Sequence, residues 1–309
     1  MNQLQETIPQ YLEFCRYQKR LDEKTLKAYR IDLRQFVEQV NAGRALEVSE
    51  ISKEVLEAYI GMLHRGFKPK TVKRKIASLK AFFHYLEYKD MIVTNPFNRM
   101  RVKFREPVIL PKTIPLSTVE HFLVIMYREY AETTTAFRKQ NTLRDIAVIE
   151  LLFATGMRIS ELCALKPEDV NLQERTILIY GKGAKERRIQ IGSEAVADIL
   201  EKYQWEYHEE MKKSNRFFVN QSGAPVSDQA IRRMINRYSQ LAGIELHITP
   251  HMFRHTFATC LMEEDVDIRY IQEMLGHSSI NITQIYTHVT MAKQRDILTT
   301  KHPRQKFRV

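Results

Sequence analysis

Six residues in the second half of the chain are of the types that phosphoryl transfer requires. In chain order they are Arg158, Lys182, His251, Arg254, His277 and Tyr286. A guanidinium is permanently charged and can bond two phosphate oxygens at once. An imidazole or an ammonium can move a proton, and a tyrosine hydroxyl can form a covalent intermediate. Each residue alone has a more ordinary explanation, so the argument depends on their occurring together.

The first of these residues lies in ATGMRISEL, residues 154–162. Gly156 allows a tight bend, and Arg158 follows at the start of a helix whose Ile159 and Leu162 are expected to face inward. An arginine at a helix start can hold a phosphate, although such an arginine more often faces solvent.

Lys182 lies between two glycines in the sequence GKGAKE. The strand-like runs 176–180 and 187–191 flank this sequence and predict a β-hairpin. The glycines let the backbone approach a partner closely, so the lysine can reach into a groove. A solvent-exposed hairpin lysine is the alternative, and Lys185 is a rival candidate.

His251 and Arg254 are three residues apart in HMFRHTFAT, on a helix that Pro250 helps to start. This spacing places both side chains on one helical face. His255 follows His251 by four residues, and two histidines one turn apart can bind zinc. The glutamate of a metalloprotease motif is missing, however, and Arg254 would put a positive charge beside the metal. No metal site is therefore expected.

The last two residues of the set are nine positions apart, in LGHSS and TQIYTHV. Gly276 is expected to end a helix, with His277 in the turn that follows. Tyr286 is expected on a short helix over 279–290. A lone tyrosine on a helix is most often a residue at the edge of the core.

The complete set resembles the catalytic residues of the tyrosine recombinases, also called the phage integrase family. The phrases TGMRISEL, GKGAKER, HMFRHTFAT and LGHSSINITQIYTHV are most similar to the Xer-type branch. This resemblance implies a site-specific DNA recombinase. In such an enzyme Tyr286 attacks the scissile phosphate, giving a 3'-phosphotyrosine and a free 5'-hydroxyl. Arg158 and Arg254 clamp the non-bridging oxygens, and Lys182 protonates the leaving 5'-oxygen.

The resemblance extends to the supporting residues, the assembly and the cofactors. His251 and His277 would assist by proton transfer and hydrogen bonding, and Glu161, three residues after Arg158, would orient the site. The partners implied are a double-stranded DNA site and a homo- or hetero-tetramer, with no membrane. The reaction would need no metal, no ATP and no other cofactor.

The fold class expected is mainly α: a helical DNA-binding domain over 1–98, a linker over 99–115 and an α+β catalytic domain over 116–309 with a small antiparallel sheet (the tyrosine recombinase fold). Apolar residues at helical spacing predict helices over 8–19, 23–40, 52–65 and 69–89. The last of these carries a buried stripe of Val72, Ile76, Leu79, Phe83 and Leu86.

Basic residues beside that stripe are candidate phosphate contacts, although a run of charge can also be a solvated face. They are Lys70, Lys73, Arg74 and Lys75, with Arg101 and Lys103 in the proline-containing linker. Residues 1–106 hold 21 Lys and Arg against 13 Asp and Glu, whereas residues 107–309 hold 27 against 24. Most of the attraction to a polyanion is thus expected in the first third.

In the second domain a helix is expected from about Thr118 to 131–135, and another over 143–154. Residues 127–142 look longer than the usual connection between the first two helices of this domain. They could form a solvated insertion or a contact between subunits. Further helices are expected near 193–210, 228–242, 250–262 and 267–275.

The whole chain has a formal net charge of +11 and a pI near 9.4, which favours a nucleic acid or another polyanion as partner. The first residues show no signal peptide and no run is apolar enough for a membrane span, so a cytoplasmic location is expected. Two other functions fit parts of the pattern. They are a topoisomerase-like enzyme that nicks and closes DNA as a monomer, and a non-catalytic DNA-binding protein, for which the complete residue set is a poor fit.

Overall fold

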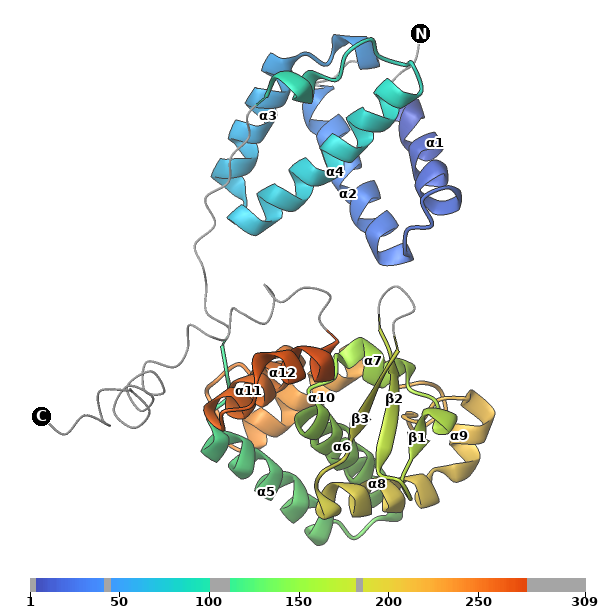
Figure 1. Cartoon of the computed structure of the whole chain (residues 1–309), viewed down its shortest axis with the longest axis vertical. Helices are drawn as coiled ribbons and strands as arrows, with labels where there is room; N and C mark the ends of the chain where they lie inside the picture. The colour runs from blue at the N-terminus through green and yellow to red at the C-terminus, as the bar shows by residue number, and fades with distance from the viewer. Residues whose placement is uncertain (1–3, 42–45, 101–111, 182–185, 277–309) are drawn as a thin grey trace, which may run out of the picture. The chain divides into compact units, whose positions relative to one another are not determined.

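The computed structural model describes residues 4–41, 46–100, 112–181 and 186–276. The chain divides into two compact units, residues 1–108 and 109–309, and the division lies inside the predicted linker. Figure 1 shows the elements of both units, each of which is described by itself. Within the described ranges, no helix is long and apolar enough to cross a membrane.

In its described residues the first unit is a bundle of four α-helices, as the sequence predicts. They are α1 (Leu4–Tyr17), α2 (Glu23–Val40), α3 (Lys53–Gly66) and α4 (Pro69–Tyr88). Helix α4 packs against α2 and α3, and α1 packs against α2. All five apolar residues of the predicted stripe on α4 are buried. Helix α1 starts four residues before the predicted position, because Leu4 is buried and its N–H donates to the carbonyl of Leu46 at 3.0 Å.

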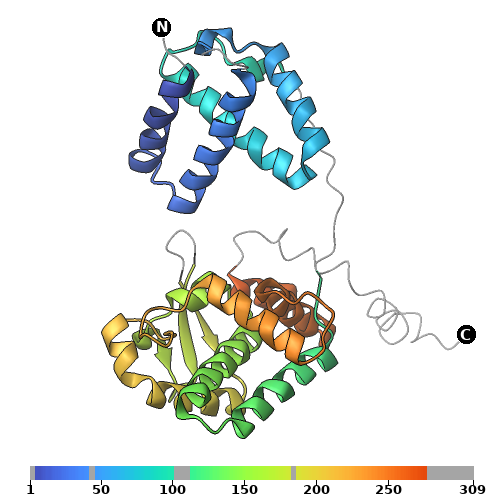
Figure 2. The same cartoon turned by 180° about the vertical axis from the view of Figure 1, so that it is seen from behind.

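The second unit is helical with one small sheet. The α-helices of its described residues are α5 (Leu116–Glu132), α6 (Ala136–Thr155), α7 (Ile159–Ala164), α8 (Glu194–Glu206), α9 (His208–Ser214), α10 (Asp228–Leu241), α11 (Pro250–Glu263) and α12 (Ile268–Leu275). Helix α6 packs against α5, α7, α8 and α11. Figure 2 shows it crossing the middle of the unit with α5 beside it. Buried residues on α6 therefore bring most of the unit into one core.

Three antiparallel strands form the sheet, in the order β1 (Val170–Asn171), β2 (Thr176–Tyr180) and β3 (Glu186–Gln190). The pairing of β2 with β3 confirms the predicted hairpin, and β1 is a strand that the sequence did not predict. In this register Ile177 lies opposite Ile189, and Ile179 lies opposite Arg187. Both isoleucines of β2 are buried, so Arg187 shares the core-facing side of the sheet.

The predicted long connection over 127–142 is wrong. Helix α5 continues to Glu132 and α6 begins at Ala136, so only three residues join them. Polar residues in FRKQNT suggested a loop, but they lie in the first turns of a long helix, where Arg138 and Lys139 are exposed and Thr142 is buried. One of them, Gln140, donates to Glu206 on α8.

The predicted single helix over 193–210 is two helices, α8 and α9. Tyr207 interrupts them with a backbone of φ −110° and ψ 16°. Its ring packs on Tyr203 at 4.8 Å between ring centroids, and burial of this aromatic pair fixes the change of direction.

Candidate active site

Arg254, on α11, is the most buried of the described catalytic candidates, at 4% exposed. Its Nη1 donates to the carbonyl of Gly156 at 2.8 Å, and its Nη2 donates to the carbonyl of Leu275 at 2.7 Å. Those carbonyls lie at the C-terminal ends of α6 and α12, where helices present partial negative charge. The guanidinium is therefore held by two helix ends.

Gly156 is required at the end of α6 for two reasons. Its φ of +59° lies in the left-handed region, which a residue with a Cβ adopts at a cost of about 1 kcal/mol. An added Cβ would also lie 2.5 Å from Cδ1 of Phe257, and 3.0 Å from Cδ2 of Leu275. The predicted tight bend is thus confirmed, and it brings the carbonyl of Gly156 to Arg254.

Arg158 is the N-cap residue of α7, as predicted, and it is paired with Glu161. Its backbone N–H donates to Oε2 of Glu161 at 2.8 Å, and its Nη1 donates to Oε1 at 2.7 Å. A weak third contact joins Nη2 to the carbonyl of Gly276 at 3.5 Å. The Arg158 side chain is 34% exposed, so the guanidinium is oriented by the protein and still reachable from solvent.

Glu161 is buried, and two opposing effects set its pKa. Burial raises the pKa, whereas hydrogen bonds from Arg187 and from the backbone and side chain of Arg158, with the charge of Arg187, lower it. The net result is a pKa below the ordinary 4.5, so Glu161 stays ionised near neutral pH. This agrees with the expected orienting role.

Arg187 is a member of the site that the sequence argument did not single out. Both of its Nη atoms donate to the carboxylate of Glu161, and its Nε donates to the carbonyl of Met274 at 2.8 Å. One signal was available in the sequence. Arg187 alternates with Ile189 and Ile191, which places an arginine on the core face of a strand, where it must find an acidic partner.

His251 lies on the first turn of α11 and is coupled electrostatically to the arginines of the site. The His251 side chain is exposed at the surface, but the protein around its ring still lowers its pKa below the ordinary 6.5 by partial desolvation, and the charges of Arg232, Arg254 and Arg158 lower the pKa further. Asp228 opposes the shift without reversing it. His251 is therefore neutral at pH 7 and able to accept a proton.

Removing the charge of Arg232 should raise the pKa of His251. An NMR pH titration of the free protein is expected to give a midpoint below 6.5 for His251, and Arg232→Gln should move that midpoint upward, because the imidazolium loses a repelling charge. Arg233→Gln, which alters the next exposed arginine on α10, is the control. A midpoint above 6.5, or one that is the same in the unaltered protein and in Arg232→Gln, would contradict the electrostatic coupling.

His255 is also kept neutral, because burial and the neighbouring His251 and Arg254 lower its pKa to about 4. Among the residues that the structure describes, no three His, Cys, Asp or Glu side chains are grouped to hold a metal.

Five of the predicted site residues lie outside the described residues. They are Lys182, His277, Tyr286, Arg101 and Lys103, together with the rival Lys185 and the helix over 279–290. The last described residue before His277 is Gly276, which caps α12 with φ +63°. Gly276 thus ends the helix as predicted.

The candidate DNA-contacting residues on α4 differ in exposure. Lys70 and Lys73 are exposed, and Arg74 is half-exposed while paired with Asp32 of α2. Lys75 is buried, with its ammonium 3.2 Å from Oδ1 of Asp32. The expectation that all four line one accessible face is therefore wrong for Lys75.

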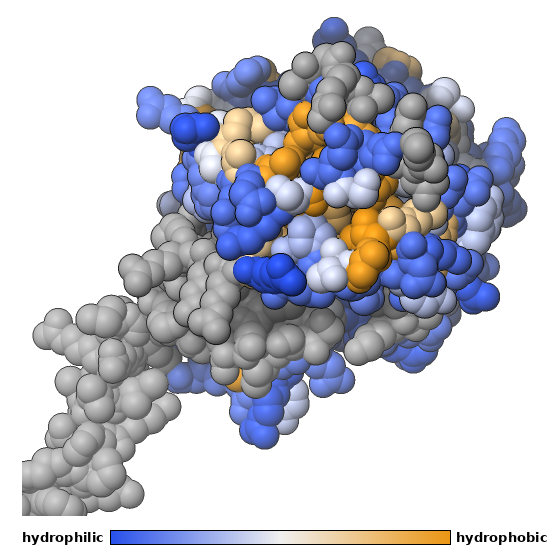
Figure 3. Space-filling model, turned by 90° about the horizontal axis from the view of Figure 1, so that it is seen from above, coloured by the Kyte–Doolittle hydropathy of each residue, from blue (hydrophilic) through white to orange (hydrophobic). Residues whose placement is uncertain are grey.

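On the one face of the first unit that Figure 3 shows, hydropathy alone does not mark a binding surface. The face seen in Figure 3 is mainly hydrophilic, with small hydrophobic patches between polar residues. The placement of individual basic side chains therefore decides which surface suits a phosphate backbone.

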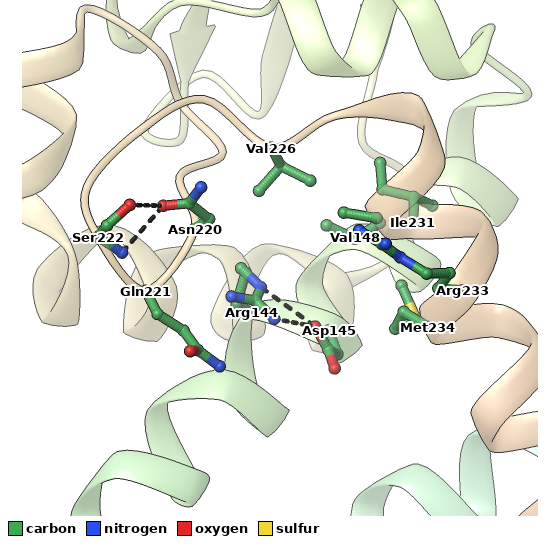
Figure 4. A pocket seen from close by; sticks show the side chains of 11 residues that line it. Arg144, Asp145, Val148, Asn220, Gln221, Ser222, Val226, Ile231, Arg233 and Met234 are labelled. Atoms are coloured by element: carbon green, nitrogen blue, oxygen red, sulfur yellow. Dashed lines mark hydrogen bonds and ion pairs between the residues drawn. The ribbon is translucent and has the colours of Figure 1, made fainter.

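One pocket of the second unit lies apart from these residues. It is lined from α6, α10 and the turn at 220–226, and the Arg144–Asp145 ion pair forms part of its wall (Figure 4). None of the catalytic candidates within the described ranges lines it. The candidate site is instead a set of charged groups at helix ends, which suits a macromolecular substrate.

Both units of the chain match models of one protein family. Residues 125–293 match the family model described as the phage integrase family. Residues 8–89 match the phage integrase N-terminal SAM-like domain. The chain belongs to the phage integrase family, which confirms the resemblance found in the sequence.

Curated relatives cover nearly the whole chain. A protein named tyrosine recombinase from Agathobacter rectalis is 60% identical over 99% of both chains. The tyrosine recombinase XerD of Listeria innocua is 36% identical over 97% of this chain and 100% of its own. The tyrosine recombinase XerC of Bacillus subtilis is 32% identical over 98% of both.

Solved structures show the same fold. The XerH site-specific recombinase bound to its difH substrate has a TM-score of 0.72 at 23% identity, covering 95% of this chain and 83% of that one. The XerA recombinase has a TM-score of 0.53 at 26% identity, covering 97% and 99%. The mainly α fold class with a small antiparallel sheet is thereby confirmed.

Proposed function

We propose that this chain is a site-specific DNA recombinase that cuts and rejoins strands through a covalent bond to Tyr286. The observation that carries the proposal is the fixed pair of guanidiniums, Arg254 held between two helix ends and Arg158 held by Glu161. Both arginines belong to a chain of the phage integrase family, and curated relatives along its whole length are named tyrosine recombinases.

The proposed cleavage step transfers one phosphoryl group. The hydroxyl oxygen of Tyr286 bonds to the scissile phosphorus and loses its proton to a base, for which neutral His251 is the described candidate. The bond from phosphorus to the 5'-oxygen breaks, and Lys182 gives that oxygen a proton. His277 assists by hydrogen bonding. Because the phosphotyrosine retains the energy of the phosphodiester, a 5'-hydroxyl can reverse the step without ATP or metal.

The two arginines are proposed to act on the charge that develops in the transition state. As phosphorus becomes five-coordinate, negative charge grows on the non-bridging oxygens, and donors that are already oriented stabilise it without reorganising. Arg254 has this orientation through the carbonyls of Gly156 and Leu275. Arg158 has it through Glu161.

We propose that the first unit binds the phosphate backbone of the duplex whatever its base sequence. Lys70, Lys73 and Arg74 remain the proposed phosphate contacts, and Lys75 is withdrawn because its ammonium is buried against Asp32. Arg101 and Lys103 stay predictions from the sequence. The proposed assembly is a tetramer on two duplex sites, since recombination of two duplexes requires four strand cuts. The proposed location is the cytoplasm.

Two steps test the function. Duplexes of random sequence are first incubated with the protein, and those that become covalently attached are recovered and sequenced. A supercoiled plasmid carrying two copies of the recovered site, here called the selected site, is then treated with the protein with and without EDTA. Resolved circles in both samples are expected. Relaxation alone would indicate a nicking and closing enzyme, bound but uncut DNA a non-catalytic binder, and inhibition by EDTA a metal requirement.

A further inference from the structure

We propose that Arg187 is a positioning residue for DNA cleavage, which holds Glu161 and the end of α12 so that Arg158 keeps a free positive charge for the scissile phosphate. The inference rests on the proposed recombinase function. It assigns to the site a residue that makes no contact with DNA itself and acts through its neighbours.

The contacts of Arg187 join three separate elements. From β3, its Nη1 and Nη2 reach the two carboxylate oxygens of Glu161 on α7 at 3.0 and 2.7 Å. Its Nε reaches the carbonyl of Met274, in the last turn of α12, at 2.8 Å. The guanidinium fork suits this combination, because its donors are fixed in one plane and can bond a carboxylate bidentately.

Burial separates the roles of the two arginines that share Glu161. The side chain of Arg187 is 8% exposed, whereas that of Arg158 is 34% exposed. A phosphate approaching from solvent can therefore reach Arg158 and not Arg187. Arg187 holds the carboxylate from the buried side.

The charge balance explains why a second arginine is needed. With Arg158 alone, Glu161 would neutralise the one guanidinium that the DNA can reach. With Arg187 also paired to the carboxylate, the three groups carry one net positive charge, and Arg158 is both oriented and available to an anion.

Gly276 shows that the end of α12 is shaped around Arg187. A Cβ at Gly276 would lie 3.0 Å from Nη1 of Arg187 and 3.1 Å from its Cδ. The glycine also has φ +63°, which allows the chain to turn there. The contact between Arg187 and Met274 thus fixes the final turn of α12, two residues before Gly276 and three before His277 in the sequence.

The test compares substitutions that keep or remove the charge. Arg187→Lys keeps the charge but cannot bond both carboxylate oxygens and the Met274 carbonyl in the same geometry, and Arg187→Gln removes the charge. Arg188→Gln is the matched control, because Arg188 is exposed and next to Arg187 on the same strand. For each variant we would measure the melting temperature, the affinity for the selected site, and the single-turnover rate of covalent attachment to a nicked duplex.

A second substrate distinguishes positioning from a loss of folded protein. It carries a methylphosphonate at the scissile position, so one charged non-bridging oxygen is replaced by a neutral methyl group. If Arg187 acts by orienting Arg158 toward that charge, replacing Arg187 should slow covalent attachment by a smaller factor on this substrate. Arg158→Lys is the positive control for the same behaviour.

The expected result for Arg187→Lys is affinity close to that of the unaltered protein and attachment slowed on the order of 10²-fold on the phosphodiester, as for a misplaced catalytic group. On the methylphosphonate the rate ratio should shrink, as it should for Arg158→Lys. Arg188→Gln should retain the unaltered rate on both substrates.

Four results would each overturn the inference. The first is an unaltered rate for Arg187→Lys, and the second is an equal loss of rate on both substrates. The third is a loss that follows the unfolded fraction in both Arg187 variants, and the fourth is an equal loss for Arg188→Gln. Failure of the proposed function looks different, because the unaltered protein would then form no covalent attachment, and the role of Arg187 would fall with it.

Discussion

Replacing Tyr286 by phenylalanine is expected to leave DNA binding intact and to abolish covalent attachment. The phenylalanine ring has the size of the tyrosine ring but lacks the hydroxyl oxygen that must bond to phosphorus. A gel that separates free protein from the DNA adduct under denaturing conditions measures the loss, and a mobility shift with the same duplex measures binding.

The matched control is Tyr270→Phe. Tyr270 lies on α12, is 63% exposed, and is the described tyrosine that precedes His277 most closely in the sequence. The same atom is removed, yet the adduct should form at the unaltered rate. An adduct that survives in Tyr286→Phe and disappears in Tyr270→Phe would move the nucleophile to Tyr270.

Replacing Arg254 by alanine is expected to slow cleavage on the order of 10²- to 10³-fold, as loss of one preorganised transition-state donor does in other enzymes. Stability should fall as well. The carbonyls of Gly156 and Leu275 lose their buried donor, at about 1–3 kcal/mol for each unsatisfied group. Single-turnover cleavage and denaturant unfolding measure the two effects separately.

Arg233→Ala is the control for the Arg254 substitution, because it removes the same charge from an exposed position on α10. Its unfolding free energy should change by no more than about 0.5 kcal/mol, and its cleavage rate should stay close to that of the unaltered protein. Equal cleavage by Arg254→Ala and Arg233→Ala would remove Arg254 from the proposed clamp.

The parts of the site that the sequence predicts are those set by local chemistry. Gly156 and Gly276 end helices with positive φ, as residues without a Cβ can do. Arg158 and Glu161 are three residues apart, so one turn of helix brings them together. In these cases the spacing of the residues along the chain is enough to predict their geometry.

The parts that the sequence did not predict depend on partners far away in the chain. The carboxylate of Glu161 lies 26 residues before Arg187, and the Met274 carbonyl lies 87 residues after it. Lys75 was expected on an exposed face, but Asp32, 43 residues earlier, holds its ammonium inside the bundle. Only tertiary packing reveals such pairs, because a buried charge must be matched wherever its partner lies in the sequence.

Helix α6 illustrates the same limit for the fold. Its apolar part, 143–154, was predicted, whereas its first turns were not. Residues 136–139 are exposed and 140–141 are half-buried, so they show no apolar stripe that would predict a helix. The buried positions begin at Thr142.

The most direct test of the central claim is to identify the residue joined to DNA. The adduct with the selected site would be digested with nuclease and trypsin and analysed by mass spectrometry. The tryptic peptide 270–293 contains both Tyr270 and Tyr286, so fragmentation must place the added nucleotide. We expect a nucleotide joined through its 3'-phosphate to the Tyr286 oxygen. Attachment to any other residue, or cut DNA with no attached protein, would contradict it.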